Sequence, residues 1–104
     1  MKQLEKTEKL NELFIAYQSL FTDKQIEYFK MYYELDYSFQ EIADIFKVSR
    51  NAIYDQLKKI EENLIIYEEK LKLVQLRKKR IELLNKYFNT KDEKYLLMLQ
   101  RMDE

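Results

Sequence analysis

Residues 38–59 constrain the fold of this chain most strongly, because their pattern predicts two short helices joined by a tight turn. Ser38 and Glu41 form a capping box, which predicts a helix beginning at Phe39. Ser49 is suited to cap a second helix beginning at Arg50. Two capped helices separated by so few residues are typical of a helix-turn-helix.

Apolar side chains recur at helical spacing in both helices, so each is expected to bury one face. Ala43 is small enough to let the second helix cross closely, and Val48 is expected to plug the turn. The residues predicted to face inward are Phe39, Ile42, Ala43, Phe46, Ala52, Ile53 and Leu57. The residues predicted to face outward are Arg50, Asn51, Tyr54, Asp55 and Lys58.

The outward positions carry side chains that can contact phosphates or base edges, so the pattern favours a nucleic-acid-binding motif. Arg50, at the start of the second helix, adds its charge to the positive end of the helix dipole, and Lys47 lies in the turn beside it. Asp55 puts a negative charge on the same face. The competing interpretation is an ordinary helical hairpin with a solvated face.

The chain resembles the YlxM-like small helix-turn-helix proteins of low-GC bacteria, and more distantly the promoter-reading domain of sigma factors. The matching segments are Thr22-Asp23-Lys24-Gln25, Tyr32-Tyr33, Asp36-Tyr37-Ser38, Glu41-Ile42-Ala43, Val48-Ser49-Arg50, Ala52-Ile53-Tyr54-Asp55 and Tyr67-Glu68-Glu69-Lys70-Leu71. The resemblance implies a regulatory or accessory role in protein targeting by the signal recognition particle. One departure is Lys47, where the family often has Gly or Asn. A left-handed Lys47 would cost on the order of 1 kcal/mol.

The chain contains neither Gly nor Pro, so sharp turns and strand corners are hard to build. This absence predicts an all-α fold, and the capping boxes and apolar stripes predict five or six helices. With 104 residues, 46% of them hydrophobic, residues 1–104 are expected to form a single helical domain with a C-terminal helical extension at 75–104.

The apolar stripes and caps place the other helices. The first is expected over residues 3–21, and a second opens at a capping box formed by Thr22 and Gln25 and ends near Asp36. A third capping box, Thr90 with Glu93, predicts a short final helix.

A long helix is predicted to follow the motif, because apolar residues continue in steps of four and three through Leu64, Tyr67, Leu71 and Val74. Ile81, Leu84 and Phe88 continue the same phase. An unbroken helix to Phe88 would be on the order of 58 Å long, so a break near residues 73–76 is favoured. The long stripe also predicts a homodimer, unless the first or last helix covers it.

Charge is uneven although the formal net charge is zero. Residues 23–46 carry a net charge of −4, and residues 47–80 a net charge of +5. Lys59 and the run Arg77, Lys78, Lys79 and Arg80 extend the set of candidate nucleic-acid contacts. Four consecutive helical positions wrap around the axis, so a solvated surface is the other interpretation of that run.

The composition argues against an enzyme. The chain has no His and no Cys, so the commonest general base, zinc sites and disulfides are missing, and without Gly there is no phosphate-cradling loop. We expect no catalytic residues, no metal and no cofactor. The N-terminus lacks an apolar signal core and no apolar run could span a bilayer, so we expect a soluble cytoplasmic protein without membrane contact.

Three functions stay open at this point. The first is a nucleic-acid-binding accessory of the signal recognition particle, contacting its RNA or its GTPase. The second is a promoter-binding regulator that reads DNA. The third is a dimerising interaction protein in which the helix-turn-helix serves only as a scaffold.

Overall fold

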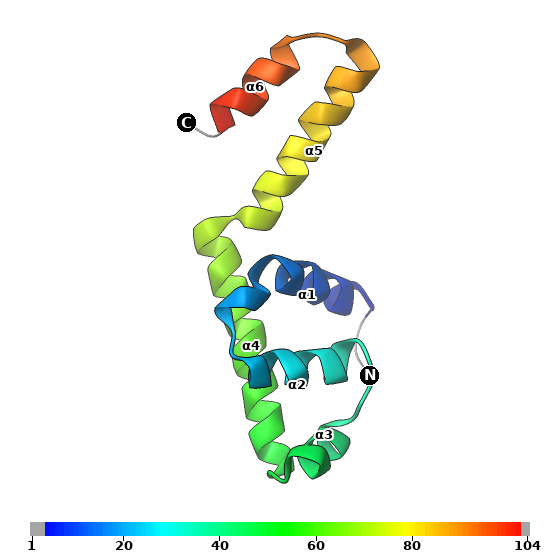
Figure 1. Ribbon diagram of the computed structural model, residues 1–104, viewed down its shortest axis with the longest axis vertical. Coiled ribbons are helices and arrows are strands. Elements are labelled where there is room, and N and C mark those ends of the chain that lie inside the picture. The colour runs from blue at the N-terminus through cyan, green and yellow to red at the C-terminus, as the bar shows by residue number, and fades with distance from the viewer. Residues whose placement is uncertain (1–3, 103–104) are drawn as a thin grey trace. The chain divides into compact units, whose positions relative to one another are not determined.

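The computed structural model describes residues 4–102, and Figure 1 shows their helices. The α-helices are α1 (Leu4–Tyr17), α2 (Asp23–Tyr33), α3 (Phe39–Phe46), α4 (Arg50–Leu71), α5 (Leu73–Thr90) and α6 (Lys94–Met102), and a single 3-10 turn, η1, spans Gln18–Leu20. Within this described part of the chain there are six α-helices and no strand, which confirms the predicted all-α class. The helices divide into two compact units, and the boundary in the sequence lies between Leu71 and Lys72.

The first unit is built around α4, against which α1, α2 and α3 all pack (Figure 1). Ile53, Leu57, Ile60 and Leu64 line the buried face of α4 at helical spacing. Between α1 and α2 the rings of Phe14 and Phe29 stack with centroids 4.0 Å apart. The other buried residues of this core are Leu10, Leu13, Tyr17, Phe21, Tyr28, Tyr33, Ile42 and Ala43.

Local capping sets where α2 and α3 begin. The Thr22 hydroxyl accepts from the backbone N–H of Gln25, and the Ser38 hydroxyl accepts from that of Glu41. In return, the side chains of Gln25 and Glu41 accept from the backbone N–H of Thr22 and Ser38. Both predicted capping boxes are therefore confirmed. The predicted first helix is shorter than expected, because α1 ends at Tyr17 and the chain tightens into η1. Its expected start at residue 3 lies outside the described residues.

The second unit is a helical hairpin in which α5 packs against α6. Val74 and Leu83 are the buried residues of α5, whereas Phe88, in the predicted apolar stripe, is 61% exposed. Ile81 and Leu84 are exposed as well. The third predicted capping box is wrong, because Thr90 is the last residue of α5, and its hydroxyl donates to the carbonyl of Lys86 and accepts from the backbone N–H of Asp92. The Asp92 carboxylate accepts from the backbone N–H of Lys94, the first residue of α6, at 3.0 Å.

The favoured break in the long helix is confirmed, and it falls at Lys72, one residue before the predicted segment. Lys72 has φ of 55°, so its backbone is left-handed and α4 cannot continue into α5. Lys47 and Lys91 are also left-handed, each directly after a helix, and so is Asp36 in the loop between α2 and α3. In a chain without glycine, these non-glycine residues take the helix-ending conformation at a cost of about 1 kcal/mol each.

Candidate nucleic-acid interface

The turn between α3 and α4 holds the two helices of the candidate motif together. Lys47 ends α3 in a left-handed conformation with φ of 56°, and the N–H of Val48 donates to the carbonyl of Ala43 at 3.0 Å. Ser49 then accepts from the backbone N–H of Ala52 at 3.1 Å, as its predicted capping role requires. Val48 does not plug the turn, since 39% of it is exposed. The turn is closed by the left-handed backbone of Lys47 and the Val48–Ala43 hydrogen bond, and not by burial of the Val48 side chain.

The buried faces of α3 and α4 largely follow the sequence prediction. Ile42, Ala43, Ile53 and Leu57 are buried, and Phe39, Phe46 and Ala52 are half-buried. Because one side of α4 is thus committed to the core, the opposite side of its first two turns is left exposed.

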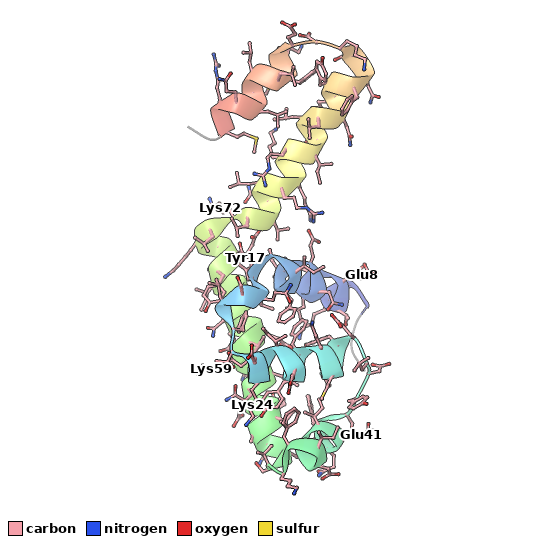
Figure 2. The ribbon with its side chains drawn as sticks, viewed as in Figure 1. Glu8, Tyr17, Lys24, Glu41, Lys59 and Lys72 are labelled. Atoms are coloured by element: carbon pink, nitrogen blue, oxygen red, sulfur yellow. The ribbon has the colours of Figure 1, made fainter. Side chains whose placement is uncertain are left out.

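The exposed side of α4 arranges the predicted contact residues in two neighbouring rows. Residues four positions apart lie on one face of a helix, so Arg50, Tyr54 and Lys58 form the first row. Asn51 and Lys59 begin and end the second, with Asp55 between them. All six are exposed, and Lys59 is labelled on α4 in Figure 2. Lys47 is exposed in the turn beside Arg50. At 100° per residue these positions spread over about half of the circumference of α4, from Arg50 to Lys59, with Asp55 among them. We call the predicted contact residues of the motif the α4 face: Lys47, Arg50, Asn51, Tyr54, Lys58 and Lys59.

An aromatic cluster that the sequence pattern did not reveal supports the α4 face from α2 and α3. The guanidinium carbon of Arg50 lies 5.4 Å from the centre of the Phe39 ring. Tyr54 meets the same ring edge-on at 5.6 Å, and Tyr32 stacks on it at 4.7 Å. These contacts limit the positions open to Arg50 and Tyr54 before any ligand binds. The one sequence signal was Phe39 itself, an aromatic residue directly after the Ser38 cap.

Two tyrosine–glutamate hydrogen bonds fasten α4 to the helices behind it. The Tyr33 hydroxyl donates to Glu61, and the Tyr17 hydroxyl donates to Glu68 at 2.6 Å. Lys6 adds an ion pair to Glu61, with 3.6 Å between Nζ and Oε2. Burial raises the pKa of Glu61 above its ordinary value, and the Lys6 charge opposes this rise. The bonds to Glu61 hold α4 in the turn that follows Lys58, and the bond to Glu68 holds it about two turns further along.

The remaining predicted contacts lie in the other unit. Arg77, Lys78, Lys79 and Arg80 are exposed on α5 and belong to the hairpin, so they are not part of the α4 face. Being consecutive, they point to different sides of their helix. Within residues 4–102 no three His, Cys, Asp or Glu side chains gather as they would around a metal ion. Nor does that part of the chain contain a helix apolar and long enough to cross a membrane.

Comparisons with known proteins find a family model and several relatives that match the sequence of this chain. The model of the UPF0122 family, described as helix-turn-helix, YlxM / p13 like, matches residues 4–102. YofM of Lactococcus lactis subsp. lactis is 42% identical over 109 aligned positions, which cover 98% of this chain and 96% of that protein. YlxM of Bacillus subtilis is 49% identical over 83 positions, covering 80% of this chain and 76% of YlxM. A UPF0122 protein of Bacillus pumilus is 53% identical over the same shares.

Proposed function

Because this chain belongs to the UPF0122 family of YlxM / p13-like helix-turn-helix proteins, we propose that it is a nucleic-acid-binding regulatory or accessory protein. The α4 face is the proposed contact surface. The observation that carries the proposal is that exposed basic and polar side chains, with Asp55 among them, occupy one side of α4 while its other side is buried in the core.

Within this surface the residues have different proposed roles. Arg50 lies at the N-terminus of α4, where its charge and the helix dipole act together on a phosphate or a guanine edge. Lys58 and Lys59 contact the phosphate backbone further along, and Lys47 contacts it from the turn. Asn51 and Tyr54 face the bases. The family comparison supports a helix-turn-helix, and the assignment of residues to roles is our inference.

Charge reversal of Arg50→Glu together with Lys58→Glu tests the proposal. Both side chains are exposed, so the melting temperature should stay within a few degrees of wild type while nucleic-acid binding is lost. The matched control is Lys24→Glu with Lys30→Glu, which makes the same charge change on exposed positions of α2. The control should keep its binding, because these lysines lie outside the α4 face.

The measurement is a salt titration with duplex DNA and single-stranded RNA, using sequences recovered from nucleic acid that copurifies with the protein. About four phosphate contacts predict a slope of log K against log salt near −4 on duplex DNA and near −3 on single strands. If the α4 variant binds as wild type does, the α4 face is not the binding surface. Arg77, Lys78, Lys79 and Arg80 then become the candidate contacts.

The accessory role in the signal recognition particle pathway and the cytoplasmic location stay predictions. Identifying the proteins and nucleic acids that copurify with the chain tests the accessory role. Recovery of the particle's RNA or GTPase supports the accessory role, whereas enrichment of specific promoter DNA supports a transcriptional regulator. We further propose that the chain acts as a homodimer, because exposed apolar side chains remain on both units.

A further inference from the structure

The two units of this chain carry opposite net charges. Residues 4–71 contain nine basic and fourteen acidic side chains, a net charge of −5. Residues 72–102 contain nine basic and three acidic side chains, a net charge of +6. A chain with a formal net charge of zero is therefore made of an acidic unit and a basic one.

The basic hairpin also exposes a continuous apolar stripe. Leu73, Arg77, Ile81, Leu84 and Phe88 follow one another in steps of four, four, three and four, so they lie within about 80° of each other around α5. The four apolar members are between 39% and 61% exposed. We call this set the α5 stripe, and Arg80 lies at its edge. Its spacing is that of a helix face that packs against another helix.

The chemistry of the α5 stripe narrows the kind of partner. A nucleic-acid backbone would contact the arginines and leave four large apolar side chains in water, so it satisfies only part of the surface. A second copy of the same hairpin would bury the apolar residues but place a charge of +6 against +6. The partner that satisfies both features is a protein surface that is acidic and apolar.

The outer face of α1 has this chemistry. Glu5, Glu8, Glu12 and Ile15 follow in steps of three, four and three, which places them on one side of the helix. The opposite side, with Leu10 and Phe14, is buried in the core. Ile15 is 70% exposed, more than any other large hydrophobic residue in the described chain. Figure 2 labels Glu8 on this helix. We call this set the α1 face.

We propose that the α5 stripe of one chain docks on the α1 face of a second copy. Arg77 and Arg80 pair with Glu5 and Glu8 of the second copy, and Ile81, Leu84 and Phe88 cover its Ile15. In a two-fold dimer the contact occurs twice, which closes the assembly at two chains. This inference rests on the proposed homodimer and supplies its interface, leaving the α4 face outside it.

Charge reversal on each side of the contact tests the proposal in the full-length chain. The first variant is Glu5→Lys with Glu8→Lys, and the second is Arg77→Glu with Arg80→Glu. Each should weaken dimerisation about tenfold or more, because like charges then face each other across the contact. Sedimentation equilibrium at micromolar to tens of micromolar gives the dissociation constants, and circular dichroism confirms that the helices persist.

Mixing the two variants gives the decisive measurement. In a mixed dimer each reversed face meets the reversed stripe of the other chain, so the equimolar mixture should recover the wild-type affinity. The matched control is Lys78→Glu with Lys79→Glu, which changes the same run by the same charge on other sides of α5. The control should stay within about threefold of wild type, because the stripe is intact.

Failure has distinct forms. A wild-type chain that remains monomeric overturns both the homodimer and its interface. A wild-type dimer that the reversals leave unchanged, or that the control weakens equally, overturns the interface alone. A mixture that fails to recover overturns the contact between copies. The nucleic-acid titration with Arg50→Glu and Lys58→Glu is separate, so none of these results decides the role of the α4 face.

Discussion

Apolar side chains are buried to different extents in the first unit, residues 4–71, and in the second unit, residues 72–102. In the first unit four helices share one core, and fourteen large or small apolar residues are buried there. In the second unit only Val74 and Leu83 are buried among the described residues, while large apolar side chains remain exposed along both helices. The helices of the two units are similar in hydrophobicity. The units differ in how many neighbouring helices are available to cover each apolar face.

The largest expected effect comes from the core of the first unit. Ile60→Ala should lower the free energy of unfolding by about 2–5 kcal/mol, because Ile60 is fully buried and its removal leaves a cavity. Urea denaturation followed by circular dichroism measures the loss. In the second unit Leu97→Ala should change stability by about 0.5 kcal/mol or less, since Leu97 is 55% exposed.

Ile65→Ala is the matched control for Ile60→Ala, because it makes the same change at an exposed position of α4. Equal losses in the free energy of unfolding for Ile60→Ala and Leu97→Ala would contradict the difference in burial between the units. The expected single domain of residues 1–104 also predicts that both units unfold in one transition. Two calorimetric transitions would contradict that prediction.

A smaller effect concerns the left-handed residues that end helices in a chain without glycine. Lys47→Gly should raise the free energy of unfolding by about 0.5–1 kcal/mol, because glycine adopts φ of 56° without strain but gives the unfolded chain more freedom. Lys59→Gly, at an exposed position within α4, should instead lower it by about 1 kcal/mol. Denaturation midpoints measure both, and a loss at Lys47 would show that its left-handed backbone carries no relievable strain.

The smallest effect is a pH dependence specific to the first unit. The pKa of Glu61 is raised by burial, so the folded chain binds a proton there more tightly than the unfolded chain does. This carboxyl therefore contributes more stability at acid pH and loses that contribution as pH rises from its ordinary pKa through the raised one. Glu61→Gln should remove this decline, whereas Glu69→Gln, which makes the same change at an exposed position of α4, should retain it. Urea denaturation midpoints measured between pH 4 and 7 would show this decline. Identical pH profiles of the midpoint for wild type and Glu61→Gln would contradict the prediction.

The candidate site was predictable to the extent that it depends on one helix. The exposure of Arg50, Asn51, Tyr54 and Lys58 follows from periodicity, since Ile53 and Leu57 must face the core. The ring of Phe39 beneath Arg50 was not predictable, because it requires the crossing of α3 and α4 in space. The Tyr33–Glu61 and Tyr17–Glu68 hydrogen bonds join residues 28 and 51 positions apart, for which the sequence carries no local signal.

By itself, the sequence determined the helical class, the starts of α2, α3 and α4, and the inward face of the motif. Caps at Thr22, Ser38 and Ser49 act on backbone groups within three residues, so their chemistry can be read from neighbouring letters. Only the tertiary structure decided that Lys72 ends α4 and that Leu83, instead of Leu84, is buried in α5. Neither outcome is a local property, because a residue is buried only where another helix lies opposite it, and many phases of an apolar-rich helix can meet that condition.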